Sequence, residues 1–525
     1  MTPAGSPPPG AGVVRWLRPF VLLLLLVLVL ILDAPAAAPS LAWAARDDGG
    51  HPANRHATLE LLRSPAGHLV VGATLTRTNG QTAYVVSAFD EQGQPLWRTE
   101  HVSTNQSENT LRRMIQDDSG HLLLTGTSDT LKLSPTGQVL WTAPHGGRDV
   151  ACDTNGHAYL TGHRSNAFPL LKLDAATGTN VWERLIEDPQ APPNTVPRYT
   201  GTQAVAVMAG QGICLLGRIE HYFGPRLGSF FWLSAASYGP DGQPHWFQSR
   251  VGGTNAWPDN GYGDLMQVVR LLPALDGGVV FAINNYSTGW YHRAFSLADT
   301  GNLRWDYLRQ WPSGGQPGTP AVASSPQGEA VLTGHSSGQL LVFVLGADGA
   351  ERWEARHSRP GAGAAAGRAV AHDPVVGLDV ATGVQDELAW GVTTIATVAY
   401  EHATSRELWH QYYPGPVPGY HEATGVAVDG RGAVYVAGHS DNAAGGRDLL
   451  LLKYAPAATA QLTPGGDVAV TIPAAPGTPV TLEATTDFAA WSAVGTVLAG
   501  TNAAARVVDT NAMGRFPWRF YRPRP

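Results

Sequence analysis

The 525-residue chain has few cysteines, few lysines and few long apolar runs, which are the features of disulfide-rich, basic and membrane-spanning proteins. It has two cysteines, which excludes a disulfide scaffold. Only three of its 35 basic residues are lysines and its net charge is −7, so it lacks the basic surface that binds nucleic acid. No long apolar run occurs after residue 45, and we therefore expect no membrane span in the mature chain.

What the chain does contain is enough apolar surface for a large core. Hydrophobic residues make up 43% of the sequence and 16 residues are tryptophan, which excludes wholesale disorder. The 61 glycines and 39 prolines indicate many turns. The length is too great for one ordinary domain.

The first 44 residues predict an export signal. Arg15 and Arg18 precede an apolar run from Phe20 to Leu32, and small residues follow, ending in Ala42-Trp43-Ala44. A basic region, a short apolar core and an A-x-A pattern are typical of a secretory signal peptide. We expect cleavage at residue 44, a linker over 45–56, and a secreted, periplasmic or envelope location. An uncleaved membrane anchor is the alternative.

The two cysteines would then meet an oxidising compartment, where a disulfide can form. Cys152 and Cys214 each lie inside an apolar, strand-like run. The sequence therefore predicts two separate buried thiols rather than a disulfide.

A turn followed by tryptophan recurs along the body of the chain. Glycine stands four residues before the tryptophan in six copies, and Ser405 takes its place in the seventh. The tryptophans of the seven copies are Trp97, Trp141, Trp182, Trp246, Trp305, Trp353 and Trp409.

Upstream of each tryptophan, a second glycine leads into an apolar or alternating run, as in Gly120–Gly126 and Gly432–Gly438. Such runs, bounded by Gly, Pro, Asn and Asp, are typical of strands. All three lysines (Lys132, Lys172 and Lys453) occupy the same place, just before the turn. Each unit is therefore predicted to be a four-stranded meander.

Counting first strands gives eight units, which start near residues 57, 111, 148, 202, 264, 319, 368 and 423. The eighth ends near Tyr454 without a tryptophan. Such a unit cannot bury both faces alone, so the units must pack on one another around an axis. The sequence thus predicts an all-β fold: an eight-bladed β-propeller over 57–455, with seven blades as the alternative, and a small β-sandwich over 456–525.

The units resemble the SBBP-type bacterial β-propeller repeat and, more loosely, the pyrroloquinoline-quinone (PQQ) repeat. Val426–Gly438 with Asp448–Tyr454 is similar to the SBBP pattern, and Asp174–Trp182 fits the PQQ-repeat pattern D-x-x-T-G-x-x-x-W. The resemblance implies the fold and says little about activity. The tail, with Leu482–Phe488 and Phe516–Arg522, resembles a β-sandwich module found in secreted bacterial proteins.

The PQQ resemblance does not imply the quinone. Enzymes that bind it carry a vicinal disulfide and a calcium site, whereas Cys152 and Cys214 are far apart in the sequence. We therefore expect no cofactor.

Three further patterns have structural interpretations that we favour over chemical ones. Gly334–Gly338 matches the nucleophile elbow G-x-S-x-G, but that motif needs a strand–turn–helix and the serine here is predicted between two strands. The equivalent histidines of three units are predicted to be hydrogen-bonded loop residues rather than zinc ligands, because zinc needs its donors at about 2 Å; they are His163, His335 and His439. Acidic turns that resemble calcium loops offer too few oxygens and are predicted to be Asx turns; they are Asp117–Gly120, Asp153–Gly156 and Asp429–Gly432. We predict no catalytic residue and no metal site.

The connections that alternate with the short turns must open on the opposite face of the propeller, and several are long and rich in aromatics. Long loops on a rigid scaffold usually carry function. Aromatic residues with polar neighbours suit sugar rings or extended peptides. The predicted ligand-binding residues are Tyr222, Trp257, Tyr262, Trp290, Tyr291, Trp311, Tyr413 and Tyr420. The competing interpretation is that these aromatics cover blade edges and one another.

We therefore expect an exported, monomeric, non-catalytic binding or scaffold protein that recognises polysaccharide or protein. The alternative is a secreted polysaccharide lyase or hydrolase that uses Asp259 and Asp264, although no carboxylate pair has a diagnostic spacing. A third hypothesis, an assembly scaffold for membrane proteins like other PQQ-repeat propellers, lacks the lipid-anchor cysteine that would support it.

Overall fold

The structure is a computed structural model that divides the chain into two compact units, one of Pro39–Pro456 and one containing Ala457–Pro525. It describes residues 39–524 except for 104–107, 163–167, 187–195, 211, 223–228, 249–256, 259–266, 274–278, 286–289, 312–320, 456–458, 464, 474–478, 487–489, 499, 501–503 and 517–518. Within these ranges no helix is long and apolar enough to cross a membrane.

The first unit consists of antiparallel meanders whose strands pair in chain order. Meanders 1 and 2 are β2 (Arg55–Arg63), β3 (Leu69–Thr76), β4 (Thr82–Phe89) and β5 (Pro95–His101), then β6 (Leu111–Gln116), β7 (Leu122–Gly126), β8 (Thr130–Leu133) and β9 (Val139–Ala143). Meanders 3 and 4 are β10 (Asp149–Cys152), β11 (Ala158–Thr161), β12 (Phe168–Leu173) and β13 (Asn180–Ile186), then β14 (Val196–Val207), β15 (Ile213–Tyr222), β16 (Ser229–Tyr238) and β17 (Pro244–Gln248), with β18 (Trp257–Pro258) also paired to β16.

The later meanders follow the same plan. Meanders 5 and 6 are β19 (Gln267–Pro273), β20 (Val279–Asn285), β21 (Trp290–Leu297) and β22 (Leu303–Trp311), then β23 (Ala321–Ser324), β24 (Ala330–Ser336), β25 (Gln339–Leu345) and β26 (Glu351–His357). Meander 7 is β27 (Ala365–Asp373), β28 (Leu378–Asp386), β29 (Thr393–Glu401) and β30 (Glu407–Tyr413), and meander 8 is β31 (His421–Val428), β32 (Val434–Asp441) and β33 (Arg447–Ala455) with β1 (Ser40–Asp47).

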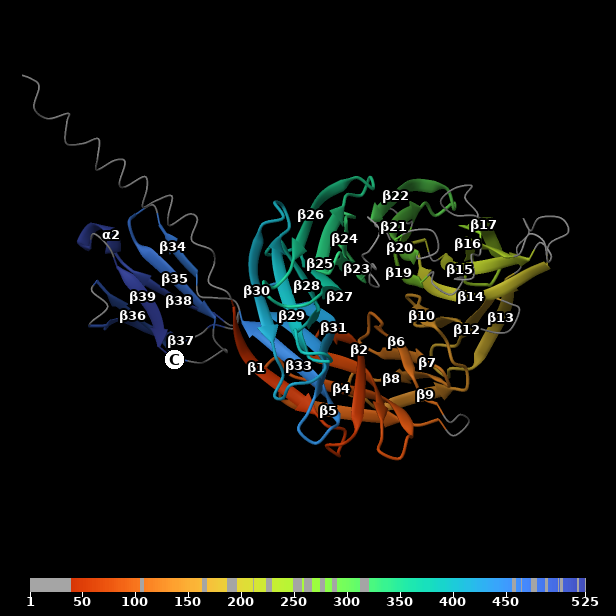
Figure 1. Cartoon of the computed structure of the whole chain (residues 1–525), viewed down its shortest axis with the longest axis horizontal. Coiled ribbons are helices and arrows are strands. Elements are labelled where there is room, and N and C mark those ends of the chain that lie inside the picture. Colours follow the sequence, from red (N-terminus) through yellow and green to blue (C-terminus); the bar gives the residue numbers. More distant parts are fainter. Residues whose placement is uncertain are drawn as a thin grey trace, which may run out of the picture. The chain divides into compact units, whose positions relative to one another are not determined.

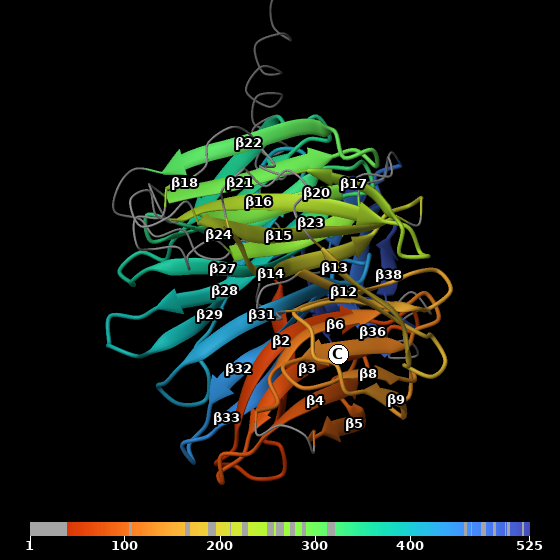
Figure 2. The same cartoon turned by 90° about the vertical axis from the view of Figure 1, so that its right-hand side faces the viewer.

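The first strands of the meanders contact one another in cyclic order, from β2 through β6, β10, β14, β19, β23 and β27 to β31, which returns to β2. Figure 1 shows the meanders following one another around a common centre, and in Figure 2 the red strands β2–β4 lie beside the blue strands β32 and β33. Apolar faces of neighbours form the core: Val86 of meander 1, for example, shares a buried cluster with Met114 and Leu124 of meander 2. The predicted propeller-type all-β fold is confirmed. The eight-blade count stays a prediction, with which this pairing agrees.

The repeated tryptophan fastens each meander to the next. The Trp97 indole N–H donates to the carbonyl of Pro135, 3.2 Å away in the last turn of meander 2. Gly137 in that turn has a φ of +81°, and a Cβ there would lie 2.3 Å from the Trp97 ring. The same bond to the following meander is made by Trp141, Trp182, Trp246, Trp305 and Trp353. Tryptophan and turn glycine recur together because five of these indoles pack on the turn glycine of the next unit. Trp353 instead meets the turn that contains Ser405.

The N-terminal strand β1 closes this series. It pairs with β33 and takes the outermost position of meander 8. The Trp43 indole N–H donates to the Glu91 carbonyl (3.2 Å) in the last turn of meander 1, and a Cβ on Gly93 would lie 2.8 Å from its ring. The tryptophan that the eighth unit lacks in sequence therefore comes from the start of the chain.

This finding corrects the linker predicted over 45–56, which overlaps the end of β1 and the start of β2. Cleavage at residue 44 stays a prediction, and it would remove Trp43 and cut through β1. The error arose because β1 is separated in sequence from the meander that it completes.

The predicted separation of the thiols is confirmed, since both cysteines are free. Cys214 is buried as predicted, but Cys152 is only partly buried, at the end of the short strand β10. Burial raises the pKa of the Cys152 thiol to about 11, so it is a poor nucleophile at neutral pH.

The second unit has two three-stranded sheets and one short helix. The sheets pair as β34-β35-β38 and β37-β36-β39. Val470, Leu482 and Val507 lie in a core that strands of both sheets share, as expected for a small β-sandwich. Its elements are β34 (Thr459–Leu462), β35 (Val468–Pro473), β36 (Pro479–Thr485), β37 (Ser492–Leu498), β38 (Ala504–Asp509), α2 (Ala512–Arg515) and β39 (Phe520–Arg524).

Candidate functional site

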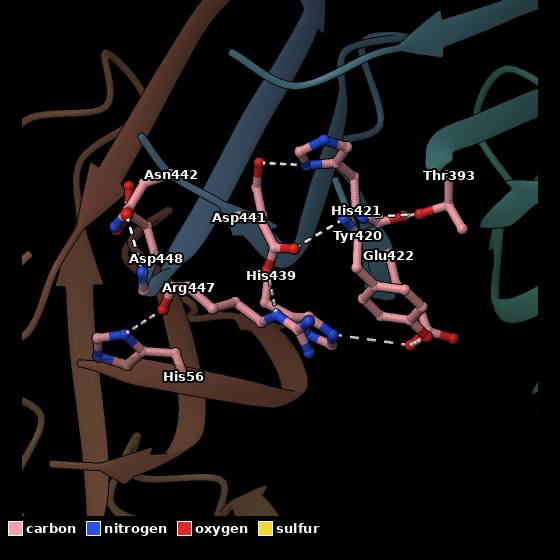
Figure 3. Close-up of polar contacts among 12 residues, drawn as sticks. His56, Thr393, Tyr420, His421, Glu422, His439, Asp441, Asn442, Arg447 and Asp448 are labelled. Carbon is pink, nitrogen blue, oxygen red and sulfur yellow. Dashed lines mark hydrogen bonds and ion pairs between the residues drawn. The ribbon is translucent and has the colours of Figure 1, made fainter. Parts of the chain in front are cut away.

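Short turns join the first two and the last two strands of a meander, and we call the propeller face that carries them the turn face. The other connections open on the opposite face, the loop face. On the loop face of meanders 7, 8 and 1, polar side chains from the ends of β27, β31, β32 and β33 form a connected network (Figure 3). Its central residues are Arg368, Tyr420, Glu422, His439, Asp441 and Arg447.

Glu422 is the first centre of this network. Its carboxylate accepts from Arg368 Nε of meander 7 (2.7 Å) and from the Tyr420 hydroxyl (2.6 Å). His439 Nε2 lies 3.7 Å away, and Figure 3 shows the ring directed at the carboxylate. Burial and the bond to Glu422 raise the pKa of Tyr420, so its hydroxyl remains a donor.

Asp441 is the second centre. It accepts from Arg447 Nε and from the backbone N–H of Tyr420, both at 2.8 Å. Burial opposes ionisation, but these two hydrogen bonds hold the pKa of Asp441 below its usual value. The Tyr420 ring contacts the Arg447 guanidinium, 4.6 Å from its centroid, and stacks on the His439 ring at 5.8 Å. These contacts fix the orientation of the Tyr420 ring and of the Asp441 carboxylate.

Several buried polar atoms near this face have no hydrogen-bond partner in the described part of the chain. They are His56 Nε2, His335 Nδ1, Ser336 Oγ and His439 Nδ1. Burial lowers the pKa of His335 and of His439 to about 4, so both rings are neutral at physiological pH.

Two of the predicted ligand-binding residues can be placed fully. Tyr420 lies in the network, and the hydroxyl of Tyr413 on β30 is 3.4 Å from Arg46, which also bonds Ser440 and Asp448. The structure thus brings both tyrosines to one seam, where each is partly buried.

Of the other predicted residues, some have only a described backbone position and the rest lie outside the described residues. Trp290 pairs directly with Trp311 across β21 and β22, and Tyr291 pairs with Gln310. Trp257 pairs with Phe231 of meander 4, and Tyr222 ends β15. Tyr262, Asp259 and Asp264 lie outside the described residues. Ligand binding by these residues stays a prediction.

The sequence interpretation missed an exposed apolar pair in a short loop. Leu388 is 82% exposed and Trp390 is fully exposed, both in the connection between β28 and β29 on the loop face of meander 7. This loop is short, and the ligand-binding residues were predicted in long loops. The sequence does contain a sign of this pair: a leucine and a tryptophan stand two residues apart in a turn, where polar residues are usual.

Two structural interpretations of motifs are supported. Ser336 ends β24 and is joined to β25 by a two-residue hairpin of Ser337 (φ 51°) and Gly338 (φ 76°), so the G-x-S-x-G segment is no nucleophile elbow. Asp117, Asp153 and Asp429 each accept two backbone N–H bonds within their own turn, as Asx turns do. His163 lies outside the described residues.

Two clusters at the seam of meanders 6 and 7 have donor sets that can hold a divalent metal. One is His357, Glu407 and His410, and the other is His372, Asp379 and His402. The sequence indicates neither cluster, because the members of each come from different strands.

Three solved structures match this chain at low sequence identity and with low TM-scores. A protein from Lactobacillus plantarum is 12% identical, with 77% of this chain and 96% of that chain covered and a TM-score of 0.39. Prolyl oligopeptidase B from Galerina marginata is 9% identical (80% and 55% covered, TM-score 0.39), and a gluconolactonase from Xanthomonas campestris is 15% identical (66% and 99% covered, TM-score 0.28). No curated protein matches the sequence.

A family model gives the more specific result. The model described as outer membrane protein assembly factor BamB, a PQQ-type repeat, matches residues 82–219 and 235–443. These ranges cover well over half of the chain and contain most of the tryptophan-to-turn contacts described above. The chain therefore belongs to the family described as outer membrane protein assembly factor BamB.

Proposed function

We propose that this protein is an exported, non-catalytic scaffold of the cell envelope that binds a protein partner through its loop face. The exposed pair Leu388 and Trp390 carries the proposal. Trp390 is not covered by other side chains of this protein, so only a binding partner can remove its ring from water. Tryptophans that become buried on binding are among the residues that contribute most to the binding energy at protein interfaces.

The carboxylates of the loop-face network support a non-catalytic role. Glu422 is held by Arg368 and Tyr420, Asp441 by Arg447, and Asp448 by Arg46. General acid–base catalysis needs two carboxylates whose environments separate their pKa values and leave them free to reach substrate. Because their oxygens already accept hydrogen bonds from arginines, these carboxylates are better suited to holding the loops in place than to transferring protons.

The chemistry of the pair favours a protein partner over a polysaccharide. Leu388 and Trp390 are both exposed and Ala389 stands between them, so the loop presents an apolar patch of the kind that marks protein interfaces. The family description names assembly of outer membrane proteins, so a β-barrel protein that is not yet folded is the partner class that we propose. The family match, together with the predicted leader, also supports the envelope location.

The test uses a urea-unfolded outer-membrane β-barrel protein, diluted into buffer, as the probe. We expect the Trp390→Ala variant to bind it about 30-fold more weakly, which corresponds to ~2 kcal/mol. The variant should melt like the parent because the replaced side chain is exposed. The matched control is Val375→Ala, which removes a 74%-exposed side chain from the turn face of the same meander.

Equal binding by the parent and Trp390→Ala would contradict the proposed surface. Binding on a glycan array without binding of the barrel protein would favour the polysaccharide alternative. Release of reducing ends from a polysaccharide would show that the protein is an enzyme and would contradict the proposed non-catalytic role.

A further inference from the structure

Four titratable side chains meet on the turn face, at the seam between meanders 6 and 7, away from the loop-face network. His372 lies near the end of β27, Asp379 on β28, and His402 in the turn after β29. Glu329 comes from meander 6, directly before β24. Topology alone brings these residues together.

The contacts within this cluster are short and form a chain. His372 Nδ1 and His402 Nδ1 each lie 2.7 Å from a different oxygen of the Asp379 carboxylate. His402 Nε2 lies 2.7 Å from Glu329 Oε2, and the two imidazole centroids are 4.4 Å apart. Three residues thus offer nitrogen and oxygen atoms within 4.8 Å of one another.

Charge makes this cluster unusual. Asp379 is completely buried, and the ion pairs that the structure shows for it are with the two imidazoles. A buried carboxylate is costly unless a cation compensates it. With Glu329 the cluster carries two carboxylates, and a single divalent cation would balance both charges.

We propose that His372, Asp379 and His402 form a Zn²⁺-binding site, in which Glu329 holds the free nitrogen of His402. Two imidazoles and a carboxylate are a known donor set for zinc. A carboxylate on the far nitrogen of a ligating histidine fixes the ring and increases its basicity, and Glu329 has that position. Water or a further donor would complete four-coordination.

The geometry needs only a small adjustment for the ion. Zinc–nitrogen bonds of about 2.0–2.1 Å place tetrahedral ligand atoms about 3.3 Å apart, so the present 2.7 Å contacts must widen by about 0.6 Å. Side-chain rotation can provide this movement.

The backbone of the site is already fixed. The His402 carbonyl accepts the Trp353 indole N–H (2.7 Å), and the His402 N–H donates to Gly377 (2.9 Å). This is also the turn in which Ser405, at a φ of 62°, replaces the usual glycine. The ion would cross-link three segments of meander 7, and the hydrogen bond between His402 and Glu329 would join the site to meander 6.

The test is Zn²⁺ binding by the full chain after removal of bound metal with a chelator. Calorimetry should find one tight site per chain, and Zn²⁺ should raise the melting temperature. Co²⁺ in its place should show the visible absorption of a four-coordinate ion. Asp379→Asn should weaken Zn²⁺ binding by at least tenfold and abolish both the thermal shift and the Co²⁺ spectrum.

The control is His410→Ala, which removes an exposed histidine of the other cluster and should leave the tight site intact. If Asp379→Asn does not fold, the partly exposed His402 provides the substitute His402→Gln, with the same expected loss. The proposal is overturned if the parent binds no Zn²⁺, or if tight binding persists in Asp379→Asn and His402→Gln.

Discussion

Individual histidines on the loop face make the stability of the protein depend on pH. Burial lowers the pKa of His335 and His439 to about 4, whereas an unfolded histidine titrates near 6.5. Between these values the unfolded chain binds protons that the folded chain does not. Their contribution to stability is therefore complete above about pH 6.5 and is lost as the pH falls towards 4. Urea unfolding midpoints should decrease over this window.

The contribution of the two rings can be isolated by substitution. The double variant His335→Gln, His439→Gln removes both groups and should reduce the pH dependence between pH 6.5 and 4, while His56 and His421, whose pKa values burial also lowers, keep part of it. An unchanged slope in this variant would show that other groups cause the acid sensitivity.

At the scale of single elements, the contact between a tryptophan and the last turn of the next meander is the interaction that repeatedly joins neighbouring meanders. Gly137→Ala would place a Cβ 2.3 Å from the Trp97 ring, and the turn would have to move. Gly80 has nearly the same φ (+83°, against +81°), but a Cβ there meets nothing within 4 Å. Both substitutions carry the same backbone strain, so the difference between them measures the packing alone. We expect Gly137→Ala to be less stable than Gly80→Ala by about 1–3 kcal/mol in denaturant unfolding.

Two variants with equal stability would show that the turn moves aside without cost. In that case the contact between Trp97 and the next turn would depend on the indole hydrogen bond to Pro135 rather than on ring packing.

At the scale of the whole molecule, the ring depends on a strand from the start of the chain. β1 contributes Trp43, and its Arg46 bonds both Asp448 (2.7 Å) and Ser440 (2.6 Å) of meander 8. A protein that begins at residue 48 should therefore melt well below one that begins at residue 39, because meander 8 loses its outermost strand. Differential scanning calorimetry of the two proteins measures the effect.

The same strand constrains processing of the predicted leader. Mass spectrometry of the exported protein should find an N-terminus at or before Ser40, so that β1 stays whole. A terminus at Ala45 together with an unchanged melting temperature would contradict the role assigned to β1.

The sequence by itself determined the repeating unit and the propeller fold, because the residues that join neighbouring units recur at a short, fixed spacing in the chain. Six of the seven repeated tryptophans stand four residues after a turn glycine, and five of the seven pack on the turn glycine of the next unit. The missing eighth tryptophan was also visible, but its replacement was not. Arg46 and Asp448 are separated by 402 positions, and only closure of the ring brings them together.

The functional candidates were decided by tertiary structure for the same reason. Tyr413 and Tyr420 could be named from their aromatic loop, whereas Glu422 and Arg368 meet across two meanders that no local pattern links. Exposure of Trp390 is a property of the folded surface, since an apolar loop residue in sequence can equally be covered. His372, Asp379 and His402 come from three segments of one meander, and the antiparallel pairing of β27, β28 and β29 places their side chains around one point. Periodicity specifies the strands, but the registers and the ring that join distant strand ends exist only in the folded protein.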